Sequence, residues 1–194
     1  MSSEKKLSPE VTEVIYAQSL GHSFYHRAVE YYILTRFSFK HHLVHSVGYV
    51  AHQSLEHLIK GGLAEVGYSS RQIKSLNHPL DDLLREVAEI RAISLDILPR
   101  IREIETWYKL RYPSLADKPF ALTTSIKREE KLTKPQPLTG EAPMNFPLNL
   151  EEVDEAFANL AKELNWSVIA WLLNQPSWEE IYTWKNEHTF TESN

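Results

Sequence analysis

The sequence predicts an all-α protein, folded as an antiparallel bundle of four or five helices. Apolar residues recur every three or four positions over several long segments, which is the spacing of one helix face. No segment alternates convincingly between apolar and polar residues, and no Asn-Gly or Asp-Gly pair signals a hairpin. The length of 194 residues suits one domain, so we expect a single helical domain over residues 1–194.

The first helix is expected over about 9–35. Ser8 is a suitable N-cap, Pro9 is preorganised for the first helical position, and Glu10 matches the positive end of the helix dipole. Apolar residues then keep helical spacing as far as Tyr32. Gly21 is expected to bend or interrupt this helix.

The second helix is expected over about 41–66, where the apolar stripe is clearest. Gly61 and Gly62 lower the helix propensity near its end, which indicates close packing against another helix. Gly67 is expected to end the helix at the C′ position.

Two more helices are expected after a polar loop over 69–77. Pro79 opens the third helix, since proline is favoured in a first helical turn. Pro99 marks a break near 95–99, and the fourth helix is expected to end at Pro113.

Residues 113–148 hold six of the ten prolines and show little periodicity. We expect an irregular, Pro-rich arm here, inside the domain and before the last core helix. Two interpretations stay open: the arm is disordered, or it lies ordered over the bundle through its apolar residues. Those residues are Phe120, Leu122, Ile126, Leu132, Met144 and Phe146.

Two helices are expected to close the chain, each opened by a capping box. Asn149 with Glu152 starts the fifth helix, which is expected to reach about residue 174. Pro176 ends it, and Ser177 with Glu180 then starts a short last helix to about 185, followed by a frayed tail over 188–194.

Composition excludes several classes of function. The chain has no cysteine, which excludes a disulfide scaffold, a thiolate zinc site, an iron–sulfur cluster and a cysteine nucleophile. The net charge of −5 argues against a duplex-DNA-binding protein, and residues 151–194 alone carry nine acids and two bases. We see no signal peptide and no membrane-spanning run, so we expect a soluble, cytoplasmic protein without a membrane partner.

Three short motifs follow one another between residues 51 and 113. The first contains Gln53, Glu56 and Lys60, the second is His78-Pro79-Leu80 with Leu83, and the third is Arg111-Tyr112-Pro113. In this order they resemble the HEPN superfamily of small helical bundles, found with nucleotidyltransferases and in toxin–antitoxin and defence systems. The resemblance covers about residues 20–113, and more loosely 150–174, although Pro79 stands where the family often has Asp.

This resemblance implies a ligand-binding face made of Gln53, Glu56, Lys60, His78 and Arg111. The residues alone are less specific. Gln53, Glu56 and Lys60 share one helical face, which is also typical of a solvated edge with a Glu56–Lys60 ion pair. His78 also suits a capping role, and Arg111 suits either an anion or an acid at the helix end.

Many HEPN proteins are metal-independent ribonucleases, with an arginine followed four to six residues later by a histidine near the start of the last core helix. Arginine stabilises the phosphate charge there and histidine moves a proton. Three pairs have this spacing but lie elsewhere: Arg36 with His41, Arg36 with His42, and Arg71 with His78. We therefore expect a protein that does not cleave RNA, and keep a toxin with a displaced site at Arg36, His41, His42 or His78 as the alternative.

A metal site is the third hypothesis. His41, His45, His52 and Glu56 step by four, seven and four, which brings them toward one helical face. Histidines at the rim of a packed interface are the competing interpretation, and we expect no cofactor. The resulting expectation is a HEPN-like interaction or nucleotide-binding protein. Its expected partners are a second copy in a homodimer, a nucleotidyltransferase or antitoxin, and a nucleotide or RNA.

Overall fold

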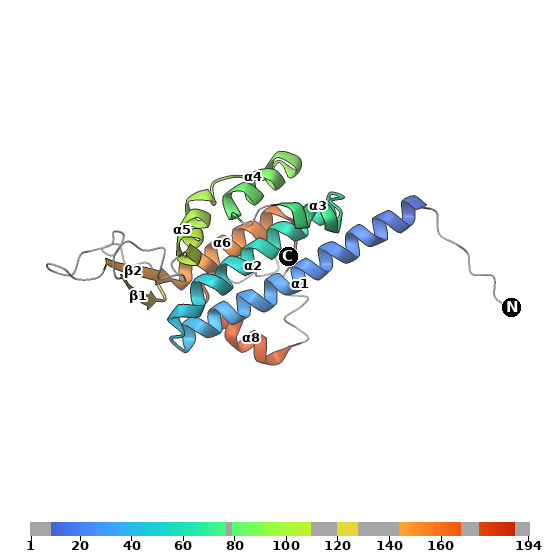
Figure 1. The fold of residues 1–194 in the computed structure, drawn as a ribbon. Coiled ribbons are helices and arrows are strands. Elements are labelled where there is room, and N and C mark those ends of the chain that lie inside the picture. Colours follow the sequence, from blue (N-terminus) through green and yellow to red (C-terminus); the bar gives the residue numbers. More distant parts are fainter. Residues whose placement is uncertain (1–8, 77–78, 110–119, 128–143, 168–174, 189–194) are drawn as a thin grey trace.

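The computed structural model describes residues 9–76, 79–109, 120–127, 144–167 and 175–188. This part of the chain is mostly helical, with one small sheet (Figure 1). The helical fold class predicted from the sequence is therefore confirmed in its coarse form. The helices are α1 (Pro9–Lys40), α2 (Val44–Glu65), α3 (Ser70–Ser75), α4 (Leu80–Arg91), α5 (Leu98–Lys109), α6 (Leu150–Glu163) and α8 (Pro176–Thr183).

The two longest helices, α1 and α2, form a helical hairpin. Helix α1 runs to Lys40, five residues further than expected, and it continues through Gly21. A Cβ on Gly21 would lie 3.3 Å from the Gly61 carbonyl, so α1 lies close against the C-terminal end of α2. The residues before Gly21 extend beyond α2, as Figure 1 shows.

Helix α2 lies at the centre of the molecule and contacts α1, α4, α5 and α6. Its glycines make this possible, because each faces a neighbouring element at short range. A Cβ would meet Tyr25 at Gly61 and Leu164 at Gly62, which confirms the close packing expected for both. Gly67 has φ +99°, and its N–H bonds to the Ala64 carbonyl, so it ends the helix as predicted.

The predicted polar loop over 69–77 contains a short helix, α3, so that prediction is wrong. Ser69 is its N-cap, and Ser69 and Gln72 form the reciprocal hydrogen bonds of a capping box. The Ser-x-x-Gln pattern was present in the sequence, but it opens only six residues of helix.

Helices α4 and α5 are separated by residues 92–97. Helix α4 ends where Ala92 takes a left-handed conformation with φ +53°. Helix α5 begins at Leu98, so Pro99 lies in its first turn and not in the break that the sequence predicted. The expected end of this helix at Pro113 lies outside the described residues.

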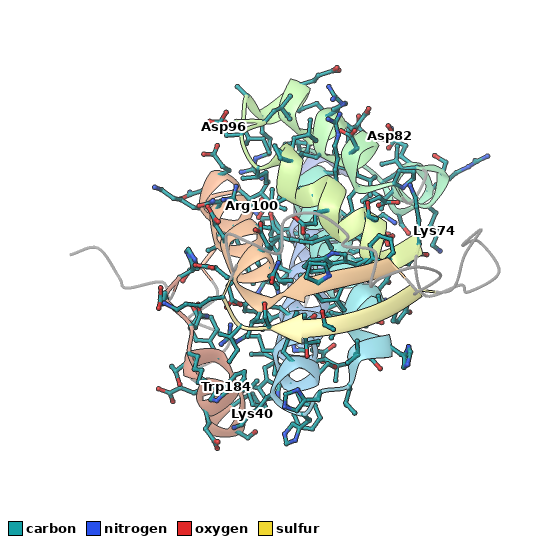
Figure 2. All side chains as sticks on the ribbon, turned by 90° about the vertical axis from the view of Figure 1, so that its left-hand side faces the viewer. Lys40, Lys74, Asp82, Asp96, Arg100 and Trp184 are labelled. Atoms are coloured by element: carbon teal, nitrogen blue, oxygen red, sulfur yellow. The ribbon has the colours of Figure 1, made fainter. Side chains whose placement is uncertain are left out.

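Two strands occupy the region expected to be an irregular arm. Strands β1 (Phe120–Ser125) and β2 (Met144–Asn149) pair in parallel, with Leu122 opposite Phe146. Figure 2 views the molecule from the end that carries this sheet. The sequence did not predict it, because neither strand alternates clearly and their pairing joins segments more than twenty residues apart.

Helix α6 ends at Glu163, about ten residues before the predicted end, and residues 168–174 lie outside the described part. The capping box predicted at its start is wrong. The Asn149 side chain accepts a hydrogen bond from Ser125 Oγ at 2.5 Å, and Glu152 is buried 3.3 Å from Arg100 Nε. The amide of Glu151 donates instead to the Ile126 carbonyl at 3.0 Å.

Helix α8 begins at Pro176, which was expected to end the preceding helix. Gln175 is its N-cap and makes no side-chain capping bond, so the capping box predicted from Ser177 and Glu180 is also wrong. Proline at the start of a helix loses no internal hydrogen bond, which explains its place here. Lys40 lies beside Trp184 after α8, with Nζ 5.9 Å from the ring centroid (Figure 2).

We predict that Gly48→Ala destabilises the fold by about 1–3 kcal/mol. A Cβ at this position would lie 2.5 Å from the Trp107 carbonyl oxygen, and backbone atoms cannot move aside cheaply. Urea unfolding measures the change. Gly21→Ala is the matched control, because its nearest neighbour, at 3.1 Å, is the flexible Glu65 side chain. Equal losses in both variants would contradict the prediction.

Candidate functional site

The polar residues predicted to share one face of α2 do form a connected set. Gln53 Nε2 donates to Glu56 Oε2 at 2.8 Å, and Lys60 Nζ donates to Glu56 Oε1 at 2.5 Å. The predicted Glu56–Lys60 ion pair is thus confirmed. The solvated-edge interpretation is wrong, because Glu56 and Lys60 are only 3% and 7% exposed. Gln53 is half-buried, so it is the member of this set that solvent reaches.

His52 extends the polar set from α2 to α5. The buried ring of His52 has Nε2 at 3.1 Å from Glu105 Oε2, and it stacks on Tyr108 with centroids 3.9 Å apart. Glu105 also accepts the Leu80 amide at 3.1 Å. Burial raises the pKa of Glu105, but the hydrogen bonds from His52 and Leu80 act against it and leave this pKa below its ordinary value.

Glu105 of α5 therefore joins α2 and α4, which carry residues of the first and second motifs, whereas the third motif lies outside the described residues. Leu80 belongs to the second motif, and Lys109 Nζ, 3.7 Å from Glu105 Oε1, lies two residues before the third. Two of the predicted ligand-binding residues, His78 and Arg111, lie outside the described residues.

Arg36, a candidate catalytic residue, is completely buried and its guanidinium points inward. Its Nε donates to the Ile181 carbonyl at 3.0 Å, its second amino group donates to the Trp184 carbonyl, and it forms an ion pair with Asp154. The pKa of Asp154 is raised by burial, which the Arg36 charge and the Tyr32 hydroxyl oppose. Arg36 thus joins α1 to α6 and to the end of α8.

The histidines paired with Arg36 by spacing lie apart from that guanidinium. His41 is exposed and packs on Phe37, with centroids 4.2 Å apart, and His42 is exposed in the turn before α2 with φ +54°. The Arg36–His41 and Arg36–His42 pairs, kept as candidates of the ribonuclease alternative, therefore do not assemble. Arg71 is exposed on α3, and its partner by spacing, His78, lies outside the described part.

The proposed metal ligands do not come together either. His41 and His45 are exposed near the turn between α1 and α2, whereas His52 is buried against Glu56 and Glu105. Among the described residues, no group of three or more His, Asp or Glu side chains could hold a metal ion. The spacing of His41, His45, His52 and Glu56 in the sequence thus does not bring their side chains together into one metal site.

Sequence reasoning missed a second set of side chains, on the edge of α2 that faces α1. His57 lies one turn after Gln53, and its ring packs against Phe24 and Tyr31 of α1. His57 Nδ1 lies 2.8 Å from the Gln53 carbonyl oxygen. Burial lowers the pKa of His57; the hydrogen bond to Gln53 and the charge of Glu56 oppose this, whereas the positive charges of Lys60 and Arg27 act with it, and the pKa stays below its ordinary value. Helical spacing of aromatic residues on two neighbouring helices was the available signal.

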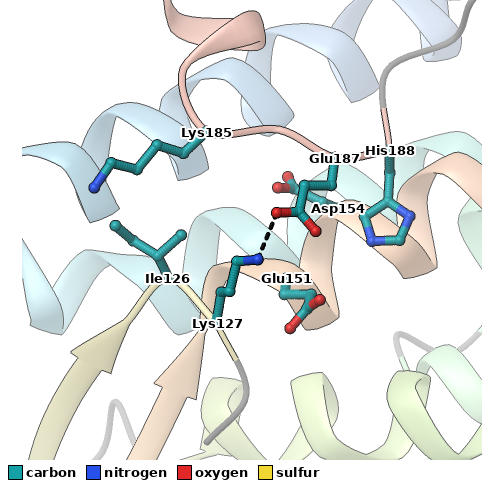
Figure 3. Close-up of a pocket in the computed structure, with 7 residues that line it drawn as sticks. All are labelled: Ile126, Lys127, Glu151, Asp154, Lys185, Glu187 and His188. Atoms are coloured by element: carbon teal, nitrogen blue, oxygen red, sulfur yellow. Dashed lines mark ion pairs between the residues drawn. The ribbon is translucent and has the colours of Figure 1, made fainter.

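Two hollows lie elsewhere. One is a small hollow of about 10 Å³ beside Asp154, lined in part by the exposed Lys127–Glu187 ion pair at 2.5 Å (Figure 3), which is room for about one water molecule. The other is an open hollow of about 420 Å³ at the turn between α1 and α2, lined by Leu34, Leu43, His45 and Tyr49 among others.

Comparison with protein-family models, with curated proteins and with solved structures finds no match to this chain. The described helices include none whose length and apolar character would let it cross a membrane.

We predict that Arg36→Met lowers the free energy of unfolding by about 3–5 kcal/mol, because it leaves the Asp154 carboxylate buried without its cation. The double variant Arg36→Met/Asp154→Leu should recover part of this loss. Lys40→Met, which breaks an exposed ion pair with Glu180, should cost less than about 1 kcal/mol. Urea unfolding compares the three, and a double variant no more stable than Arg36→Met would contradict the prediction.

We predict that His57 stays neutral at neutral pH, with the proton on Nδ1, because the Gln53 carbonyl accepts that proton. Its pKa should lie below the ordinary 6.5, and titration should begin only as the pH falls below that value. Nitrogen-15 NMR of the imidazole measures both the pKa and the tautomer, with the protein unfolded in urea as reference. A proton on Nε2, or a pKa above the unfolded value, would contradict this.

Proposed function

We propose that the chain is a HEPN-like helical protein that binds a nucleotide and does not cleave RNA. The observation that carries the proposal is the meeting of α2, α4 and α5 at Glu105. His52 from α2 and the Leu80 amide from α4 both contact this carboxylate of α5. Helices α2 and α4 carry residues of the first two motifs that resemble the HEPN superfamily, and their meeting at Glu105 is a contact that sequence spacing alone does not require.

The central position of α2 also fits this family proposal. Helices α1, α4, α5 and α6 all contact α2, as expected for a bundle built around the helix that carries the first motif. We extend the proposal to a homodimer, and to a nucleotidyltransferase or antitoxin as a protein partner, because these accompany the family resemblance.

The absence of ribonuclease activity is proposed from the surroundings of Arg36. A catalytic arginine must reach the substrate phosphate, and the donors of Arg36 are directed to Ile181, Trp184 and Asp154. His41 and His42, the proposed proton-transfer groups, lie on the surface away from it.

Binding is tested on the full chain with the four nucleoside monophosphates by isothermal titration calorimetry. At least one should bind with one molecule per chain. Arg111→Gln and His78→Gln should each weaken it about tenfold, because each removes a polar contact to an anionic ligand. Arg71→Gln, an exposed arginine on α3, is the matched control and should change nothing. No binding by the wild-type chain would overturn the proposed function.

Catalysis is tested by incubating the pure protein with total RNA in the presence of a chelator. We expect intact RNA. Cleavage that disappears in His41→Ala or His42→Ala would establish the ribonuclease alternative instead. Cleavage that persists in both variants and in His78→Ala would also refute the proposal, while showing that another residue is responsible.

A further inference from the structure

The surface between α1 and α2 carries complementary stripes of side chains. Phe24, Arg27 and Tyr31 stand at i, i+3 and i+7 on α1, so they share one face of that helix. Gln53 and His57 stand at i and i+4 on α2. The His57 ring lies between two of the α1 rings, with centroids 5.9 Å from Phe24 and 5.3 Å from Tyr31. Arg27 is therefore placed one turn of α1 from each ring that contacts His57.

The hydrogen bond of His57 Nδ1 determines whether Nε2 is a donor or an acceptor. The Gln53 carbonyl can only accept, so Nδ1 carries the proton and donates it over 2.8 Å. Nε2 of the neutral ring is then an acceptor. Within the described part of the chain, Nε2 has no hydrogen-bond partner, and the residue is partly exposed. A ligand that donates an N–H or O–H is what this atom can bind.

Arg27 supplies a positive charge that acts on His57. It is exposed, and no carboxylate among the described residues pairs with it. The other cation near His57, Lys60, already pairs with Glu56. A guanidinium offers two parallel N–H donors, which suit a phosphate. The surface thus combines an anion site, flanking aromatic rings and an acceptor.

We propose that this surface, formed by Phe24, Arg27, Tyr31, Gln53 and His57, binds a nucleotide whose base carries a ring N–H, namely uracil or guanine. Arg27 binds the phosphate, the rings of Phe24 and Tyr31 flank the base, and His57 Nε2 accepts the ring N–H. This inference rests on the proposed function. It names the class of nucleotide that binds beside Gln53 and His57, the partly exposed polar residues of α2.

The choice of base follows from the fixed tautomer. Uracil N3 and guanine N1 carry a proton, whereas cytosine N3 and adenine N1 present a lone pair. In the same pose, a cytosine or adenine would direct a ring lone pair at His57 Nε2, which costs a hydrogen bond and adds repulsion, and its exocyclic amino group could reach Nε2 only if the base shifted away from Arg27 and the flanking rings. We therefore expect uridine 5′-monophosphate to bind about tenfold or more tightly than cytidine 5′-monophosphate, a ligand of nearly the same size and shape.

The experiment is calorimetry on the full chain with these two nucleotides, uridine and inorganic phosphate. His57→Phe keeps a ring between Phe24 and Tyr31 but removes the acceptor, so it should abolish the preference for the uracil nucleotide. Arg27→Gln should weaken uridine 5′-monophosphate about tenfold and leave uridine unchanged. Arg71→Gln is again the control. A short oligouridine tests whether the natural ligand is a free nucleotide or RNA. If it binds more tightly than the mononucleotide, and binding still depends on Arg27 and His57, the natural ligand is RNA.

Several results would overturn the inference. Equal affinity for the uracil and cytosine nucleotides would do so, and so would inorganic phosphate binding as tightly as uridine 5′-monophosphate. If nucleotides bind but Arg27→Gln and His57→Phe have no effect, this inference fails and the proposed function stands. If no nucleoside monophosphate binds, both fail. Circular dichroism and urea unfolding of each variant show that a loss of binding is not a loss of fold.

Discussion

The buried ion pair between Arg36 and Asp154 is the constraint on which the arrangement of the bundle depends. One side chain from α1 contacts a carboxylate of α6 and two carbonyls at the end of α8. Tyr32 adds a hydrogen bond from its hydroxyl to Asp154 at 2.7 Å, and Asn186 donates to the same hydroxyl. Because a charge without its partner is costly in the interior, these helices can adopt few other relative positions.

Close contacts at glycine residues set the distance between α1 and α2. Gly61 admits the Tyr25 ring, so α1 and α2 lie near enough for side chains of both to share one surface. Glu56 and Lys60 lie on the buried side of α2, whereas Gln53 and His57 lie at its partly exposed edge. The polar residues of α2 thus form two sets. Glu56 and Lys60 are buried and pair with each other, whereas Gln53 and His57 are partly exposed and belong to the proposed nucleotide-binding surface.

Much of the fold was predictable, and the failures share a physical cause. Periodicity located α1, α2, α4 and α5, and it located Gly67 and the Glu56–Lys60 pair, because these depend on residues within one or two turns. The two strands, the burial of Arg36 and the packing of His57 against Phe24 and Tyr31 depend on partners from distant segments, which spacing along one element cannot reveal. Several polar residues chosen by motif or by spacing therefore do not form the predicted sites. Arg36 is buried in an ion pair with Asp154, and His41 and His42 are exposed away from its guanidinium.

The hydrogen bonds of Arg36 join residues separated by about three quarters of the 194-residue sequence, and this separation bears on how the protein is made. Its carbonyl partners follow it by 145 and 148 residues. A ribosome therefore releases α1 long before Ile181 and Trp184 exist, and the hairpin of α1 and α2 can form early because its contacts are local. Until the final helix emerges, the nascent bundle holds a guanidinium without its acceptors, in a site still open to water. Synthesis as far as Trp184, and not only the collapse of the earlier helices, supplies the acceptors that close this part of the interior.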